Sequence, residues 1–517
     1  RRAQSITEAR AIAQRIYTTQ DTEAQPTITV TGHTHIDVAW LWRVQETRQK
    51  MARSVATALG LMRDYPEYLF MYNQGYLLDT LSQDYPALFD GLKARKAAGQ
   101  VEIEGSLWLE PDANMTGGEA LVRHLTRGIR YHRETFDVDP EIVWLPDTFG
   151  YCAALPQLMA QSGQKVFVTH KMSWNDTNKM PHEVFWWEGL DGTRMPTYFL
   201  TTQPMESTSI NTTYCPDLRP THVMGTWRRY SQKGGRDNLW LCYGHGDGGG
   251  GPTREMLEHL RRMEVGIPGC PRVEQGPMSG FFADLVAAMH DRPEDYPAWV
   301  GELYLEFHRG TFTSVAEVKR NNRRGEAVMR RLELLAVLAH LRKGTPYPRE
   351  TLERLWDVLL LNQFHDILPG SSIREVYEDS RAEFAAFFAE AEALERSLGE
   401  ALGGGVLNPY GQAQGGLVWI DRDEVAGQVA HRADGSRGTV VPVAQVPGGG
   451  LGVLPTSAAP VADRLQVAPD RLENDALCAR FDAAGRLEAN GVVTAGAFGT
   501  VTVTIQQDGT VKTEGDE

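Results

Sequence analysis

Short apolar, β-prone runs alternate with helical stretches from about residue 26 to about residue 305. The apolar runs end at Val30, Met71, Gly105, Leu145, Thr169, Leu200 and Tyr243. Helical stretches such as 118–133 and 254–263 lie between these runs or follow the last one. This alternation is typical of βαβ units that build a parallel sheet. About seven units in succession predict an α/β fold with a (β/α)7-type barrel, which we assign to residues 26–310.

The pattern changes on both sides of this region. Residues 1–25 include an amphipathic helical stretch, which we expect to form an N-terminal helix or brace. Residues 311–402 carry apolar positions at helical spacing and predict a three-helix bundle that supplies a metal ligand. Residues 403–517 hold apolar runs between Gly, Pro and Asp-Gly turns. They predict a β-rich region, and we expect it to be truncated, the start of a larger β domain.

Three of the predicted strands end in short polar strings that each contain an aspartate. The strings read GHTHID at 32–37, WLPDTFGY at 144–151 and GHGDG at 244–248. A fourth string, QFHD at 363–366, adds another His-Asp pair from the helical region. Because α/β folds place their chemistry at the carboxyl ends of strands, we expect these strings to meet at one site.

The histidines and aspartates of these strings predict a metal site. His35 and Asp37 are two residues apart, so on an extended backbone both side chains point the same way and reach one ion. Asp147 and His365 complete a set of two nitrogens and two carboxylates, with His33 as a supporting partner. This composition favours one zinc ion, or cobalt or manganese in its place, over magnesium or calcium.

Each string also has an ordinary structural interpretation. His35 can be a buried histidine, Asp37 and Asp147 can be helix N-caps, and His365 can be a C-terminal cap. The glycines around Asp247 can form a flexible loop. Together, however, two carboxylates beside one metal indicate hydrolysis by acid/base or nucleophilic catalysis. Nearby tryptophans suit the apolar face of a sugar ring, although most of the 12 in the chain are expected in the core.

Composition narrows the range of partners. The net charge of −15 disfavours nucleic acid and anionic membranes, which need clustered Lys and Arg. No apolar run is long enough to predict a transmembrane helix, and the N-terminus shows no apolar signal core. The five cysteines are widely spaced without a CxxC pair, which favours reduced thiols and a cytoplasmic location. The sequence leaves open whether the chain forms a homo-oligomer.

The strings together resemble glycoside hydrolase family 38, the α-mannosidases, and most of all its cytosolic and bacterial branch. Seven segments carry the resemblance in the family's order: 32–42, 108–114, 144–151, 173–178, 243–252, 301–310 and 362–370. Joint occurrence of these segments is specific, whereas any single one is not. The resemblance implies a (β/α)7 barrel, then a three-helix bundle, then β-rich domains.

The resemblance also implies roles for individual residues. It implies that zinc is bound by His35, Asp37, Asp147 and His365. Asp147 would be the nucleophile and Asp247 the general acid/base of a retaining enzyme that releases terminal α-linked mannose from oligosaccharides or free glycans. Candidate sugar contacts are Asp366, Asp112, Asn114, Tyr151 and His170. Expected supporting residues are Glu110, Trp174, Glu306, His308 and Arg309.

Two other functions fit part of the pattern. A metal-dependent carbohydrate deacetylase would also use an HxD-type site, with Asp147 as base, but would not need an acid at Asp247. A sugar-binding protein that has lost catalysis would not keep competent residues at every candidate catalytic position. Zinc content and turnover of an aryl mannoside distinguish all three.

Overall fold

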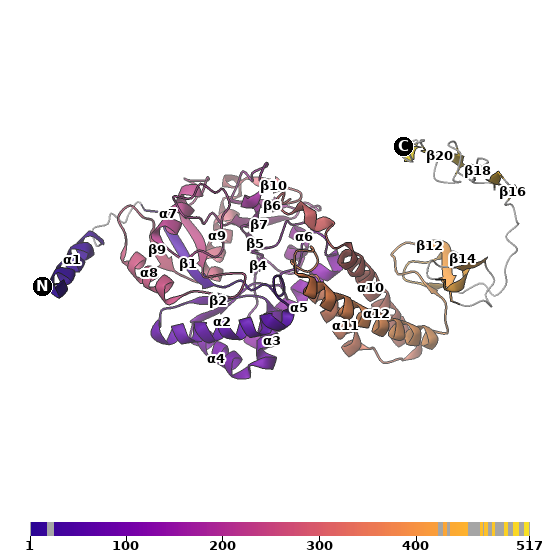
Figure 1. The fold of residues 1–517 in the computed structure, drawn as a ribbon, viewed down its shortest axis with the longest axis horizontal. Coiled ribbons are helices and arrows are strands. Elements are labelled where there is room, and N and C mark those ends of the chain that lie inside the picture. Colours follow the sequence, from indigo (N-terminus) through magenta and orange to yellow (C-terminus); the bar gives the residue numbers. More distant parts are fainter. Residues whose placement is uncertain are drawn as a thin grey trace. The chain divides into compact units, whose positions relative to one another are not determined.

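The computed structural model describes most of the chain as two compact units. The units are Arg1–Leu398 and Gly399–Glu517, and each is described by itself. The described residues are 2–17, 25–421, 428–431, 435–452, 466–468, 470–473, 478–480, 491–494, 500–505 and 511–515. Figure 1 shows the fold as a ribbon whose colours run along the sequence from indigo to yellow.

Strand β1 (Thr27–His33) is the centre of the first five-stranded sheet. Its register pairs Thr27–Gly32 with β8 (Asn238–Tyr243), and β9 (Arg272–Gln275) pairs with the first four residues of β1. Strand β2 (Phe70–Tyr72) pairs with the last two residues of β1 and then with β3 (Val101–Ile103). Every pairing in this sheet is parallel, as the alternation of apolar and helical segments predicts.

The second five-stranded sheet is mainly parallel. Its order is β10 (Ala298–Val300), β6 (Val184–Glu188), β7 (Arg194–Phe199), β5 (Val166–Thr169) and β4 (Ile142–Trp144). The β6–β7 pair is antiparallel and closes through a turn at Asp191-Gly192, where the glycine has φ +82°. This hairpin interrupts the βα alternation, and the sequence pattern did not predict it. The α/β class is confirmed.

Helices connect and cover these strands. Amphipathic α5, for example, buries Leu121, Leu125 and Phe136. The connecting helices are α2 (Val44–Asp64), α3 (Gly75–Asp84), α4 (Pro86–Ala97), α5 (Gly118–Phe136), α6 (Leu155–Gln161), α7 (Pro220–Arg229), α8 (Arg254–Val265) and α9 (Met278–Asp291). Among the described residues, no helix has the length and apolar character needed to cross a membrane.

Most of the described tryptophans in the strands belong to the core, as expected. Trp144, Trp187 and Trp240 are among the largest fully buried side chains. Helix α1 (Arg2–Tyr17) precedes the first sheet, and its Ile6 and Ile12 are 46% and 53% exposed. Its role as a brace stays a prediction.

Three long helices follow the second sheet: α10 (Ala316–Lys343), α11 (Arg349–Leu361) and α12 (Arg374–Leu402). They approach one another at Gly325 of α10. A Cβ atom there would lie 2.9 Å from Leu359 of α11 and 3.6 Å from Phe384 of α12. The glycine therefore permits close packing of all three helices.

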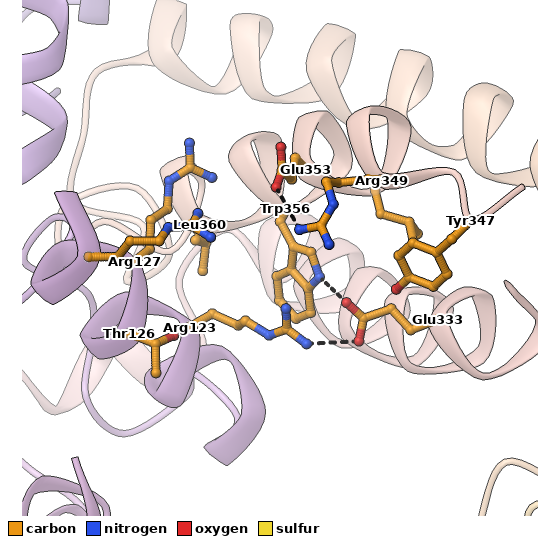
Figure 2. Close-up of a pocket in the computed structure, with 11 residues that line it drawn as sticks. Arg123, Thr126, Arg127, Glu333, Tyr347, Arg349, Glu353, Trp356 and Leu360 are labelled. Carbon is orange, nitrogen blue, oxygen red and sulfur yellow. Dashed lines mark hydrogen bonds and ion pairs between the residues drawn. The ribbon is translucent and has the colours of Figure 1, made fainter. Parts of the chain in front are cut away.

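Helix α5 is joined to α10 and α11 by polar contacts around a cavity of about 250 Å³ (Figure 2). Arg123 of α5 pairs with Glu333 of α10 at 2.8 Å, and Trp356 of α11 donates its indole N–H to the same carboxylate at 2.9 Å. Arg123 also lies 4.8 Å from the Trp356 ring centre. This joint fixes α11, which leads directly to the predicted ligand His365.

The second unit is rich in antiparallel strands, as the sequence predicts. Its larger sheet has the order β12 (Gln414–Ile420), β14 (Arg437–Val446) and β13 (Gln428–His431). The remaining strands are short: β11 (Val406–Leu407), β15 (Leu451–Gly452), β16 (Gln466–Ala468), β17 (Arg471–Glu473), β18 (Cys478–Arg480), β19 (Gly491–Thr494), β20 (Thr500–Ile505) and β21 (Val511–Gly515).

Gly128 lets α5 pack directly on the backbone that follows β3. A Cβ at this position would lie 2.2 Å from the carbonyl oxygen of Ser106, so Gly128→Ala must displace the helix. We expect it to lower the free energy of unfolding by about 3 kcal/mol, measured by urea denaturation. Gly118→Ala in the same helix meets nothing within 4 Å and is the control. Equal stability of the two variants would contradict this packing.

Candidate metal and catalytic site

The loops after β1 and β8 are joined by backbone hydrogen bonding. The amide N–H of Asp37 donates to the carbonyl oxygen of Asp247 at 2.8 Å, and Ile36 and Gly248 form an antiparallel bridge. Asp147 follows β4 in the other sheet. The carboxyl ends of strands from both sheets thus bring their aspartates toward one region, as expected for an α/β fold.

Four side chains converge there, and they are the four that the sequence predicts as ligands. One ligand atom from each of His35, Asp37, Asp147 and His365 lies within 4.8 Å of all the others. The His35 Nε2 atom is 2.8 Å from Asp37 Oδ1. The His365 Nε2 atom is 3.4 Å from Asp37 Oδ1 and 3.9 Å from Asp147 Oδ2. Two imidazoles and two carboxylates at these separations can hold one divalent ion.

The tautomer of His365 supports this fit. Its Nδ1 atom lies 2.9 Å from the carbonyl oxygen of Glu110, which only accepts hydrogen bonds, so Nδ1 carries the proton. Its Nε2 lone pair is then left buried without a hydrogen-bond partner, facing Asp37 and Asp147. A buried lone pair between two carboxylates is costly unless a proton or a metal ion lies between them. The donor set therefore fits a metal ion.

Electrostatics around His35 lead to the same conclusion. Burial alone would lower the pKa of His35, yet the carboxylates of Glu110 and Asp37 raise it well above its ordinary value. Neighbouring carboxylates also raise the pKa of His365 despite its burial. The interior of this site is therefore strongly anionic, and it favours a bound cation.

Glu110 orients His35 from behind the ligand cluster. Its Oε2 atom is 3.2 Å from His35 Nδ1, and its Oε1 atom accepts a hydrogen bond of 2.8 Å from Asn73. Asn73 in turn lies 3.4 Å from the ring of His33. Glu110 and His33 thus lie where the sequence predicted supporting residues, since such outer contacts fix ligand orientation in metal sites.

Lys171 is a functional candidate that the sequence analysis missed. Its ammonium group forms an ion pair with Asp147, and the side chain is only 6% exposed. The same nitrogen lies 4.6 Å from the ring centre of Trp174 and 5.4 Å from that of Phe149. Lys171 follows β5 (Val166–Thr169) closely, so its place at a strand end was the available signal.

Asp247 is held by Tyr214, which the sequence analysis also missed. The Tyr214 hydroxyl donates to the Asp247 carboxylate. Burial raises the pKa of Asp247, which favours the protonated form that a general acid needs. Asp247 has φ +55°, a left-handed conformation that is uncommon outside glycine and is concentrated at functional sites.

The five predicted sugar contacts fall into two groups. Asp366 lies next to the cluster, with Oδ2 3.9 Å from His365 Nε2, and burial raises its pKa to about 8. His170 packs its ring 4.7 Å from Tyr214. Tyr151, Asp112 and Asn114 make hydrogen bonds within the protein, and a sugar contact by any of them stays a prediction. Tyr151 is fully buried, with its hydroxyl bonded to Thr148 and Thr169, because it belongs to the core cluster.

The side chains of Asp112 and Asn114 hydrogen-bond to nearby backbone groups. The Asp112 carboxylate accepts the amide N–H groups of Asn114 and Met115 at 2.9 and 2.6 Å. The Asn114 side chain is 3.4 Å from the carbonyl oxygen of Phe149. These contacts shape the segment that faces His365.

The remaining supporting residues hold the segment around Lys171. Glu306 accepts the amide N–H groups of Thr177 and Asn178. Trp174 donates its indole N–H to the carbonyl oxygen of Thr212 at 3.1 Å. His308 packs its ring 4.5 Å from that of Phe149.

This fold and this site define an α/β protein with a candidate metal centre and carboxylates at its strand ends. The chain belongs to glycosyl hydrolase family 38. Residues 25–302 match the "Glycosyl hydrolases family 38 N-terminal domain", and residues 306–402 match the "Alpha mannosidase middle domain". The family resemblance inferred from the sequence strings is confirmed.

Named relatives include alpha-mannosidase 2C1 of Homo sapiens, which is 39% identical over 404 residues, covering 78% of this chain and 38% of that protein. An alpha-mannosidase of Saccharomyces cerevisiae is 38% identical over 354 residues, covering 67% of this chain and 32% of that protein. The chain therefore spans less than two fifths of the length of these relatives. An alpha-mannosidase structure from Enterococcus faecalis V583 shares the fold, with a TM-score of 0.72 and 17% identity over 92% of this chain and 61% of that one.

The orphaned nitrogen of His365 gives a direct test of the metal site. After dialysis against zinc, we expect the chain to retain one equivalent, and His365→Ala to bind it at least about tenfold more weakly because one of four ligands is lost. Metal content is measured by mass spectrometry. His259→Ala, on α8 outside the cluster, is the control. A zinc affinity of the folded His365→Ala variant equal to that of the unmutated chain would contradict the assignment.

Proposed function

We propose that this chain is the catalytic part of a retaining α-mannosidase that releases terminal α-linked mannose from oligosaccharides or free glycans. The convergence of His35, Asp37, Asp147 and His365, with an unpartnered nitrogen on His365, carries the proposal. Family membership and the α-mannosidases among its relatives support the sugar and the reaction class.

Zinc is the proposed ion, with cobalt or manganese as substitutes, because two imidazoles and two carboxylates suit these borderline metals. His35, Asp37, Asp147 and His365 would hold it. When bound, the ion supplies a positive centre that can orient sugar hydroxyls and offset negative charge. Every other contribution comes from side chains of the chain itself.

The proposed reaction proceeds in two displacements. The carboxylate of Asp147 attacks the anomeric carbon while the glycosidic C–O bond breaks, and Asp247 donates its proton to the leaving oxygen. The resulting Asp247 carboxylate then takes a proton from water, which attacks the same carbon and frees Asp147 and mannose. Lys171 holds the Asp147 carboxylate and Tyr214 holds that of Asp247.

We also propose that the two sheets form a (β/α)7-type barrel. Two contacts between them support this closure. The Ser106 amide after β3 donates to the carbonyl of Ile142 in β4 at 3.0 Å. The Tyr198 hydroxyl of β7 donates to the Trp240 carbonyl of β8 at 3.1 Å and accepts its N–H at 2.9 Å. Helices α10, α11 and α12 would then form the three-helix bundle that positions His365.

The proposed setting is the cytoplasm. Cys152, Cys215, Cys242 and Cys270 carry free thiols, which are typical of a reducing compartment. The proposed partner is the α-mannoside substrate. The acidic net charge of −15 supports neither nucleic acid nor an anionic membrane as a partner.

Hydrolysis of 4-nitrophenyl α-D-mannopyranoside tests the proposal. We expect release of nitrophenol that a chelator abolishes and that Asp147→Ala lowers by at least about a thousandfold, because the nucleophile is lost. Proton NMR of early product should show α-mannose before mutarotation. Early β-mannose would contradict the retaining mechanism, and no turnover by a folded, zinc-loaded chain would contradict the activity of this chain.

The role of Asp247 predicts dependence on the leaving group. Asp247→Asn should lower kcat/KM for alkyl α-mannosides by about 10²–10⁴-fold, because their leaving oxygen needs a proton. It should lower kcat/KM much less for 2,4-dinitrophenyl α-mannoside, whose leaving group needs none. Asp237→Asn, at the exposed position just before β8, is the control. Equal losses on both substrates would rule out the general acid role.

A further inference from the structure

Phe307 is a large apolar side chain exposed on a rigid segment. Its ring is 53% exposed, although the residue before it, Glu306, is 6% exposed. The Glu306 carboxylate accepts the amide N–H groups of Thr177 and Asn178 at 2.7 and 3.0 Å, and Arg309 donates to the Glu306 carbonyl at 3.0 Å. The backbone on both sides of Phe307 is therefore fixed, and the ring is held where it is exposed.

Two series of ring contacts lead from Phe307 to the candidate site. In the first, the Phe307 ring packs edge to face on Trp174 at 5.6 Å, and the Trp174 ring lies 4.6 Å from the Lys171 nitrogen that pairs with Asp147. The Trp174 ring thus links Phe307 to the Lys171 ammonium, which pairs with the candidate nucleophile Asp147.

The second series runs through His308. The Phe307 ring lies 5.0 Å from that of His308, which lies 4.5 Å from Phe149. The Phe149 ring in turn lies 5.6 Å from the ligand His365. Both series therefore place Phe307 at the rim of the site, outside the residues that would contact the reacting sugar.

The surroundings of this ring suit a neutral polyhydroxylated ligand. Burial lowers the pKa of His308 to about 4, so its imidazole is uncharged near neutral pH. Arg309 and Asp176 lie 3.7 Å apart and are 61% and 58% exposed, so their charges offset each other and can bond hydroxyls. Arg309 is two positions after Phe307 and Asp176 is two positions after Trp174, so an aromatic ring and a polar pair occur on the same segments, as the apolar face and hydroxyl edge of a pyranose require.

We propose that Phe307, supported by Trp174, binds the sugar ring next to the mannose that is cleaved, on the leaving-group side. This inference rests on the proposed function. The terminal mannose must contact Asp147 and Asp247 directly. Phe307 is separated from these residues by the Trp174 ring, so it can contact only the sugar on the leaving-group side. Phe307 therefore favours oligosaccharides over mannosides with a small leaving group.

Comparison of two substrates tests the role of Phe307. α-Mannobiose carries a second sugar ring, whereas α-mannosyl fluoride has no ring on the leaving side. We expect Phe307→Ala to lower kcat/KM for mannobiose about tenfold, and kcat/KM for the fluoride less than twofold. Phe307→Tyr should restore mannobiose cleavage, because it keeps the aromatic face. Phe312→Ala, at a 39% exposed ring in the same segment, is the control.

Each outcome has a distinct meaning. A loss confined to mannobiose supports the assignment, because a merely structural role would lower cleavage of both substrates. Equal losses on both, or no loss on either, would overturn it. If the zinc-loaded wild-type chain cleaves neither substrate, the proposed function itself fails, and the assignment of Phe307 fails with it.

Discussion

Concentration of buried negative charge is the constraint on which the site depends. The carboxyl groups of Asp37 and Glu110 are almost fully buried around His35 and His365. Charges removed from water are costly unless they are paired or bind a metal. Among the described carboxylates, the Lys171 ammonium forms an ion pair with Asp147. A divalent ion among the four converging ligand atoms would offset the remaining charge and complete the hydrogen-bonding capacity of His365.

The scaffold holds these groups together through backbone contacts between distant segments. Pro111 and Phe364 form an antiparallel bridge, and the His365 amide N–H donates to the Glu110 carbonyl at 3.2 Å. These bonds tie the segment after α11 to the loop before Asn114. A second connection is the ion pair between Arg123 of α5 and Glu333 of α10 (Figure 2). Rigid support of this kind is what precise ligand geometry requires.

Sequence reasoning found His35, Asp37 and Asp147 because they occur in short strings at apolar strand ends, where the chemistry of α/β folds gathers. It found His365 because a fourth His-Asp string follows a predicted helix. It missed Lys171 and Tyr214, since each is a single polar residue whose partner lies 24 or 33 positions away. It assigned Tyr151 a sugar contact but did not predict the hydrogen bonds of its hydroxyl to Thr148 and Thr169. Periodicity predicts which face of an element is apolar, whereas these roles depend on how loops from different strands meet.

X-ray absorption spectroscopy at the zinc edge of the zinc-loaded chain shows which atoms bind the ion. We expect a first shell of nitrogen and oxygen atoms at about 2.0–2.2 Å that includes two imidazoles. The His365→Ala variant should show one imidazole fewer. A first shell with sulfur at about 2.3 Å, or one without imidazole, would contradict the assignment of this cluster as the metal site.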